Sequence, residues 1–242
     1  MLILVPTAFE ARRLFGDSVQ QALANQGGTR CHVGDCEVQV DLCGFGLAAA
    51  GAGAAFALGN HLRSGVAARP REARVILVGI AGTYDPVQVA VGSALLATDV
   101  RCVGIGRGAG AAHRSAEALG WPQGLPLTGL PPVGDYLPLS APELPGEPAL
   151  HGGLLSVTSA AATSQEAAER AARSPGAVAE EMEAFAVGLA ARLYGVRLTI
   201  IRGLSNVAGE TDHSTWRTAE ALSAAKDLLT RVVEHTSLAS GR

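Results

Sequence analysis

Short apolar runs recur along the chain, and most are followed by a turn and then by a segment with helical spacing. Leu2–Val5 is an uninterrupted apolar run closed by Pro6, and Val75–Val78 is a second that ends at Gly79. Continuous runs of this length are typical of strands buried on both faces, as in parallel sheets. Val38–Leu42 alternates between apolar and polar residues, which predicts a strand with one buried face.

The remaining elements follow from the same patterns. They predict strands at 91–98, 154–158 and 197–201, and helices after Thr7 and at 47–62, 164–172, 182–194 and about 215–235. Because strands and helices alternate, we predict an α/β fold: a three-layer αβα sandwich with a central mixed, largely parallel sheet. In such sheets ligands bind at the carboxyl ends of the strands.

One segment breaks the alternation. Residues 101–153 hold eight of the twelve prolines together with many glycines, which predicts a long irregular excursion. Strand and helix patterns of the same composition resume after it, so we predict one domain over residues 1–242 rather than two domains joined by a linker.

Composition and charge exclude several classes of function. The chain has 242 residues, 48% of them apolar, and a formal net charge of -3. We therefore expect no nucleic-acid partner, because no overall positive field exists to attract phosphates. No apolar run approaches the roughly 20 residues that a membrane span needs. Met1 is followed directly by a predicted strand, with no pattern of a secretory signal, so we expect a cytoplasmic protein with no membrane partner.

No cofactor or metal is expected. The four cysteines form no C-x-x-C pair, and we interpret them as reduced, small apolar residues. The segment Gly44–Ala49 imitates a dinucleotide-binding turn, but no acidic residue ends the next predicted strand, at Gly79, where that motif requires one. We interpret the glycines as positions where a helix packs closely on the sheet.

Three carboxylates and an amide are candidate chemical groups, and each also has a structural explanation. Glu10 stands three residues after Thr7 in the pattern of a capping box. Glu181 and Glu183 open the helix predicted at 182–194, where acidic groups favour the helix dipole. In a helix these two would point about 200° apart, so at most one would enter a pocket. Asn206 follows a strand and could be a turn residue.

The order and spacing of several segments are more specific than any one of them. They are Glu10 after the first strand, Gly44–Ala50, Gly79–Gly82 followed by Val91–Ser93, Glu181–Ala184, and Arg202–Ala208. With this set the chain resembles the purine nucleoside phosphorylase and nucleosidase superfamily over nearly its whole length. Within it, Ile201–Asn206 and Asp212–Arg217 are similar to the futalosine hydrolase branch, ahead of the methylthioadenosine/S-adenosylhomocysteine nucleosidases.

The resemblance implies a nucleoside phosphorylase/hydrolase-like fold and cleavage of an N-glycosidic bond without a cofactor. It assigns catalysis to three residues: Glu10 activates water, Glu183 holds the 2′- and 3′-hydroxyls, and Asn206 contacts the base. The substrate-binding residues that it implies are Ala81, Gly82, Met182 under the ribose, Glu183, Arg202, Ser205, Asn206, and Trp216 in the base pocket. It also implies a small-molecule nucleoside as partner and a homo-oligomer, a dimer or larger.

Asn206 stands where adenine-specific relatives carry Asp. A carboxamide accepts from a protonated N7 and donates to a 6-oxo group, so it matches hypoxanthine, whereas adenine leaves one buried hydrogen bond unmade. Asn206 therefore predicts a 6-oxopurine, and the resemblance implies a hydrolase that releases hypoxanthine from futalosine on the route to menaquinone. A phosphorylase, an adenine-releasing nucleosidase and a nucleoside sensor without catalysis remain as alternatives.

Some features of the expected pocket depart from the family or stay open. Ile80 replaces a frequent Ser, and Ala160–Ala161 replaces an aromatic residue. The residues around Glu10 lack a G-D-P-x-R-like phosphate-binding segment, which favours water over phosphate as the nucleophile. Phosphate remains an alternative nucleophile because Arg12, Arg13 and Arg30 could bind it. Candidate cations for the carboxyphenyl group of futalosine are Arg217, Arg202 and Arg107, of which Arg202 could be structural.

Overall fold

The computed structural model describes residues 1–26, 28–64, 73–124, 129–146 and 148–240. Within these ranges nine strands form one sheet, in the order β10-β9-β5-β11-β4-β1-β3-β2, with β8 beside β5. The strands are β1 (Leu2–Val5), β2 (Thr29–Val33), β3 (Cys36–Leu42), β4 (Arg74–Thr83), β5 (Ala94–Val103), β8 (Tyr136–Pro138), β9 (Leu150–Val157), β10 (Ala177–Glu181) and β11 (Arg197–Val207). A separate short pair joins β6 (Gly106–Arg107) and β7 (Arg114–Ser115).

Parallel and antiparallel pairings are mixed in this sheet. β1 runs parallel to β3 and β4, and β4 runs parallel to β11, whereas β5 is antiparallel to β11 and parallel to β9. β10 pairs with β9 and also with β4, so β4, β11, β5, β9 and β10 close into a ring. The predicted central mixed sheet is confirmed, and its closure at one end was not predicted.

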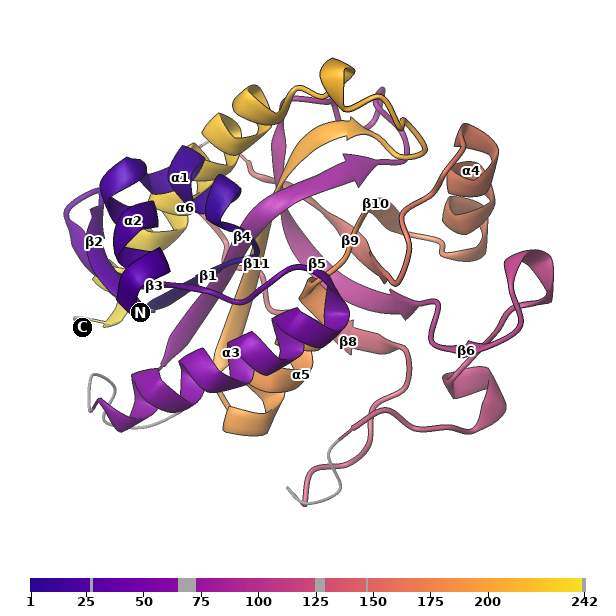
Figure 1. Cartoon of the computed structure of the whole chain (residues 1–242), viewed down its shortest axis with the longest axis horizontal. Helices are drawn as coiled ribbons and strands as arrows, with labels where there is room; N and C mark the ends of the chain where they lie inside the picture. Colours follow the sequence, from indigo (N-terminus) through magenta and orange to yellow (C-terminus); the bar gives the residue numbers. More distant parts are fainter. Residues whose placement is uncertain (27, 65–72, 125–128, 147, 241–242) are drawn as a thin grey trace.

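Helices cover both faces of the sheet, which confirms the three-layer prediction (Figure 1). α3 (Gly46–Arg63) and α5 (Ala184–Tyr194) pack side by side on one face. α1 (Ala8–Phe15), α2 (Asp17–Gln26) and α6 (Thr218–Ser240) cover the other, and α4 (Ser164–Arg173) lies apart from both groups. Two apolar clusters, one on each face, form the core.

The strand that precedes α5 corrects the sequence prediction. Residues 177–181 form β10, and the helix predicted from Met182 begins at Ala184. β10 bonds to β9 on one edge and to β4 on the other, and these ladder bonds outweigh the helical preference of Glu180 and Glu181. Glu181 therefore ends a strand, and Glu183 is the N-cap residue of α5.

Two strands extend further than their apolar runs. β4 continues to Thr83 and β11 to Val207, so the glycine-rich and polar motifs at their ends belong to the sheet. The irregular excursion is correspondingly shorter than predicted, because β5 runs to Val103 and β9 begins at Leu150.

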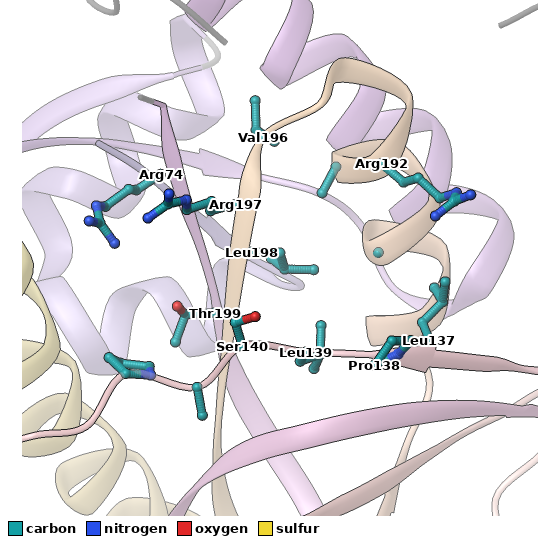
Figure 2. Close-up of a pocket in the computed structure, with 14 residues that line it drawn as sticks. Arg74, Leu137, Pro138, Leu139, Ser140, Arg192, Val196, Arg197, Leu198 and Thr199 are labelled. Carbon is teal, nitrogen blue, oxygen red and sulfur yellow. The ribbon is translucent and has the colours of Figure 1, made fainter. Parts of the chain in front are cut away.

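The excursion also contributes a strand. β5 pairs with β11 through residues 94–96 and, further along, with β8 through residues 99–101. β8 and Leu139, whose N–H donates to Thr98 O at 2.9 Å, thus occupy the edge of β5 beyond its pairing with β11. A cavity of about 600 Å³ opens between this segment and the amino-terminal part of β11 (Figure 2).

The cysteines are free, as their spacing predicts. Burial raises the pKa of Cys43 to about 12 and that of Cys102 to about 11, so both thiols are protonated core residues at neutral pH. None of the described helices is both long and apolar enough to cross a membrane.

The close packing of α3 provides a test of the fold. A Cβ on Gly53 would lie 2.1 Å from Cys43 O, whereas a Cβ on Gly51 would have Ala186 Cβ as its nearest neighbour at 3.4 Å. We expect Gly53→Ala to lower the free energy of unfolding by about 1–3 kcal/mol, because the clash is with backbone. Gly51→Ala, the matched control, should be neutral or stabilise by up to about 1 kcal/mol. Denaturant unfolding measures both, and equal effects would contradict the packing.

Candidate active site

A cavity of about 540 Å³ opens at the carboxyl ends of β4, β10 and β11. Its lining includes every predicted site residue except Arg202: Glu10, Ala81, Gly82, Met182, Glu183, Ser205, Asn206 and Trp216. The position agrees with the rule that α/β sheets bind ligands at the carboxyl ends of their strands. The tertiary structure therefore brings together groups that are almost two hundred residues apart in the sequence.

Glu10 is a buried carboxylate held by two donors. Thr7 is the N-cap of α1 and accepts from Glu10 N, as the capping pattern predicts. The Glu10 side chain does not complete the capping box: Thr7 Oγ1 donates to its Oε2 at 2.6 Å and Ile80 N donates to its Oε1 at 3.0 Å. Both bonds orient the carboxylate at the cavity wall, where it is 4% exposed.

Glu183 is the second buried carboxylate of the cavity. Its Oε1 accepts from Gly46 N, the first residue of α3, at 3.0 Å, and its Oε2 lies 3.2 Å from Arg202 Nη2. Gly46 has φ 79°, a conformation that glycine adopts readily, so the turn Gly44–Gly46 presents a backbone donor to the site. That role was not predicted, since the glycines were interpreted as packing residues.

The ionisation of Glu183 is shifted toward neutral pH. Burial raises its pKa to about 7; Arg202 opposes this shift, and the nearby charge of Glu181 reinforces it. A carboxyl group with such a pKa is partly protonated at physiological pH, which is common at functional sites and unusual for a surface glutamate.

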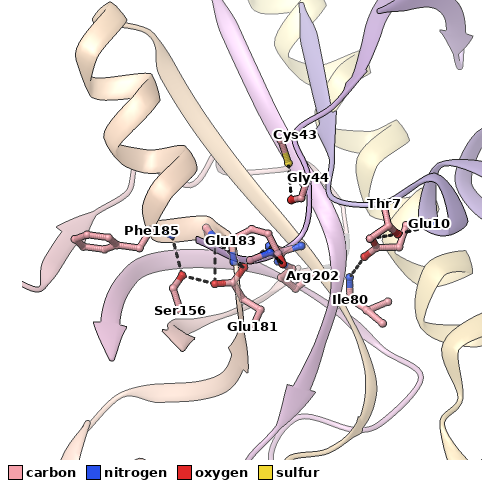
Figure 3. A network of polar contacts seen from close by, with 12 residues as sticks. Thr7, Glu10, Cys43, Gly44, Ile80, Ser156, Glu181, Glu183, Phe185 and Arg202 are labelled. Atoms are coloured by element: carbon pink, nitrogen blue, oxygen red, sulfur yellow. Dashed lines mark hydrogen bonds and ion pairs between the residues drawn. The ribbon is translucent and has the colours of Figure 1, made fainter. Parts of the chain in front are cut away.

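Glu181 stabilises the structure around the cavity through several polar contacts (Figure 3). Its carboxylate accepts from Glu183 N at 3.1 Å and from Ala184 N at 2.9 Å, so it caps the amino end of α5. It also pairs with Arg202 and accepts from Ser156 Oγ. The prediction that at most one of Glu181 and Glu183 enters a pocket was wrong, because it assumed a helix: both line the cavity and share Arg202.

Arg202 does not line the cavity, which corrects its predicted role in binding substrate. It is fully buried, and Figure 3 draws it between Glu10 on one side and the Glu181–Glu183 pair on the other. Its guanidinium passes over Gly79, where a Cβ would lie 2.3 Å from Arg202 Nη1 and 2.7 Å from Glu10 Oε1. Gly79 is therefore needed to let the arginine and the glutamate approach the same strand.

Glu180, which the sequence left without a role, connects the cavity wall to α4. Its Oε1 accepts from Ala161 N at 2.8 Å, and its Oε2 accepts from Tyr84 Oη at 2.8 Å and Arg170 Nη1 at 2.9 Å. Burial and the neighbouring Glu180 carboxylate raise the pKa of Tyr84, which keeps its hydroxyl a donor. Ala160 and Ala161, which stand where relatives have an aromatic residue, line the cavity, and the Glu180 carboxylate holds this segment in place.

Asn206 lies at a β-bulge, where the register of β11 against β4 shifts between Leu204 and Asn206. The bulge leaves Ser205 out of the pairing, and Ser205 Oγ donates to Asn206 Oδ1 at 2.7 Å. Asn206 Nδ2 donates to Val207 O at 3.0 Å, which leaves its second hydrogen available. The amide is therefore oriented at the cavity wall.

Aromatic residues complete the cavity. The Trp216 and His213 rings contact each other at a tilt of 43°, with their centroids 4.3 Å apart, and Trp216 Nε1 donates to Glu210 O at 3.3 Å. Phe9 and Phe45 also line the cavity, although 52% and 64% of their respective surfaces are exposed. The sequence analysis missed these two and His213; a large apolar residue directly after a strand end was the available signal for Phe45.

No lysine or arginine lines this cavity within the described ranges. Arg217, a candidate for the carboxyphenyl group, donates to Val91 O at 3.1 Å and pairs with Glu220. Arg107 lies in β6, outside the cavity. These two assignments, like that of Arg202, are not supported by the geometry of a single chain.

Comparison with known proteins identifies the class. Residues 24–235 match the family model of the phosphorylase superfamily, and the chain belongs to this superfamily. Two curated relatives are futalosine hydrolases: that of Streptomyces coelicolor is 34% identical over 153 residues, and that of Acidothermus cellulolyticus is 38% identical over 90. The matched segments cover 63% and 37% of this chain, and 62% and 34% of those relatives.

Solved structures share the fold over almost the whole chain. The 5′-methylthioadenosine/S-adenosylhomocysteine nucleosidase of Neisseria meningitidis, in complex with methylthio-immucillin-A, matches with a TM-score of 0.65 at 18% identity, covering 96% of this chain and 97% of that one. Futalosine hydrolase of Helicobacter pylori matches with a TM-score of 0.63 at 16% identity over the same shares.

The raised pKa of Glu183 has a consequence for stability. A carboxyl group that binds its proton more tightly in the folded than in the unfolded state makes the fold less stable as pH rises from about 4.5 through 7. Glutamine does not ionise and keeps an oxygen for Gly46 N. We therefore expect the stability of Glu183→Gln relative to wild type to rise by on the order of 2–3 kcal/mol from pH 5 to pH 8, in addition to a cost, the same at both pH values, of losing the ion pair with Arg202.

Denaturant unfolding at the two pH values measures this difference. Glu220→Gln, an exposed glutamate on α6, is the control and should change little with pH. A Glu183→Gln effect that is the same at both pH values would contradict the shifted ionisation.

Proposed function

We propose that this protein hydrolyses the N-glycosidic bond of futalosine and releases hypoxanthine, a step on the route to menaquinone. The observation that carries the proposal is the placement of two buried carboxylates, Glu10 and Glu183, and the amide of Asn206 in the walls of one cavity. The two curated relatives, which are futalosine hydrolases, support the same reaction. We extend the proposal to a cytoplasmic homo-oligomer, as the family resemblance implies.

Glycosidic cleavage needs a site that stabilises positive charge on the ribose. The bond between C1′ and N9 breaks with its electrons leaving on the purine, and the ribosyl group acquires cationic character. In the proposed role Glu183 accepts hydrogen bonds from the 2′- and 3′-hydroxyls, and its ionised form stabilises that charge. Met182, beside it in the lining, packs under the ribose.

Glu10 is placed to activate water. A water between the Glu10 carboxylate and C1′ gives one proton to Glu10 as the water oxygen forms the new bond to C1′. The departing purine takes up one proton at N7 from solvent, and Glu10 returns its proton to solvent, so that neutral hypoxanthine leaves. The bonds from Thr7 and Ile80 restrict the carboxylate to one orientation, which lowers the entropic cost of aligning the water. Arg202 serves as the buried countercharge that Glu10 and Glu183 share.

Asn206 gives the proposal its base preference. Its Oδ1, already oriented by Ser205, has a lone pair for a protonated N7, and the free Nδ2 hydrogen matches a 6-oxo acceptor. Trp216 provides an aromatic wall for the base, with Ala81 and Gly82 of β4 in the same lining.

Hydrolysis fits the cavity better than phosphorolysis. A phosphate nucleophile needs cationic partners, and the described lining contains no lysine or arginine. The three arginines that were candidates for binding phosphate have other partners. Arg12 pairs with Asp17, Arg30 pairs with Glu37, and Arg13 lies over the Phe9 ring.

The reaction itself is the first test. We expect purified protein to release hypoxanthine from futalosine, detected by chromatography, at a rate that phosphate does not change. Glu10→Gln and Glu183→Gln should each lower kcat/KM by about 10²–10⁴-fold, because each removes a group that acts in the transition state. Glu220→Gln should retain wild-type activity.

Parallel assays with inosine, methylthioadenosine and aminodeoxyfutalosine separate the alternatives. A strict requirement for phosphate would make the protein a phosphorylase, and adenine release would contradict the assigned base. Saturable nucleoside binding with no purine released from any substrate would indicate a sensor.

Asn206→Asp tests the base preference directly. A carboxylate cannot donate to a 6-oxo group but accepts from the 6-amino group of adenine, so we expect the ratio of kcat/KM for futalosine to that for aminodeoxyfutalosine to fall by about 5–150-fold. Asn206→Ala is the control and should lower both rates without reversing their order. An unchanged ratio in Asn206→Asp would remove Asn206 from base recognition.

A further inference from the structure

The cavity of about 600 Å³ beside β11 lies at the other end of the sheet from the candidate active site (Figure 2). Its lining includes the first residues of β4 and β11, whereas the last residues of these strands line the active site. A ten-residue strand spans roughly 30 Å, so the two cavities are separate. The proposed nucleosidase activity assigns nothing to this second cavity.

Two arginines meet in it, and neither has an acidic partner among the described residues. Arg74 and Arg197 are directly paired residues of the parallel strands β4 and β11, and Figure 2 shows their side chains next to each other. Within the described residues neither has an ion pair, and no carboxylate lines the cavity. Like charges on directly paired strand residues repel, so the fold bears a cost here that a bound anion would remove.

The third arginine of the cavity has a structural role. Arg192 is in the last turn of α5, where a cation favours the helix dipole, and its Nη2 donates to Pro131 O at 3.0 Å. Figure 2 shows it on the far side of the cavity from Arg74 and Arg197. The anion-binding capacity therefore belongs to the Arg74–Arg197 pair.

The rest of the lining divides into a polar and an apolar part. Thr199 follows Arg197 on the same face of β11, and Ser140 adds a second hydroxyl nearby. Ala141 and Pro142 add apolar lining on this side, whereas Leu137, Leu139 and Leu198 pack with the core on the opposite face of β11. Two guanidiniums and two hydroxyls suit an oxyanion, and Ala141 and Pro142 suit a small apolar body attached to it.

We propose that this cavity is a second binding site, for a small organic anion in which a carboxylate or phosphate group is attached to an apolar body. The anionic group binds between Arg74 and Arg197 with Thr199 and Ser140 as hydroxyl donors. The apolar body packs against Ala141 and Pro142, in the segment that follows β8. This site does not depend on the proposed nucleosidase activity.

Calorimetric titration with benzoate and with phenyl phosphate at constant ionic strength tests the proposal. We expect saturable binding of at least one probe with a Kd of about 1 mM or tighter, and none of benzyl alcohol, which lacks the charge. Arg74→Gln and Arg197→Gln should each weaken binding by about tenfold or more, whereas Arg192→Gln and Glu183→Gln should leave it unchanged. Inorganic phosphate as a probe distinguishes a free anion from one that needs the apolar body.

A second readout uses the repulsion itself. Without added anion, Arg197→Gln should melt at a temperature equal to or above that of wild type, and the probes should raise the melting temperature of wild type only. Absence of saturable binding to the wild-type protein would overturn the proposal. So would unchanged binding in the Arg74→Gln, Arg197→Gln double variant, or binding abolished by Glu183→Gln, which would place the probes in the active site.

Discussion

The buried guanidinium of Arg202 is the charge on which the candidate site depends. It is fully buried and pairs with Glu181 and Glu183, and two of its nitrogens have no hydrogen-bond partner within the described residues. Burial opposes its charge, and the carboxylates of Glu181 and Glu183 outweigh this, so the pKa of Arg202 is raised. Removing one member of such a group would leave an uncompensated buried charge, a loss of several kcal/mol.

This cluster also links the fold to the site. Glu181 uses the same carboxylate to pair with Arg202 and to cap α5, which places Glu183 at the first turn of that helix. Glu183 in turn accepts from the first residue of α3, so two neighbouring helices meet at one carboxylate. Burial in this position disfavours the ionised form of Glu183 and lowers the stability of the fold at neutral pH. Such a loss of stability is typical of catalytic sites.

Much of this architecture could be predicted from the sequence. Apolar runs identified β1, β3, β4, β9 and β11, and the position of Thr7 identified the start of α1. The motif order also placed eight of nine site residues in one cavity, because carboxyl ends of strands meet at one edge of a sheet. The predicted start of α5 was wrong, since a local helical preference cannot anticipate a strand that is bonded on both edges.

By itself the sequence determined the class of fold, the candidate chemical groups and the end of the sheet where they gather, because these depend on local periodicity and on strand direction. Only the tertiary structure decided which charged groups lie together: Glu181 pairs with Arg202, Arg202 supports the site without lining it, and Arg74 lies beside Arg197. These relations depend on strand register and on burial, which arise from contacts between residues far apart in the chain.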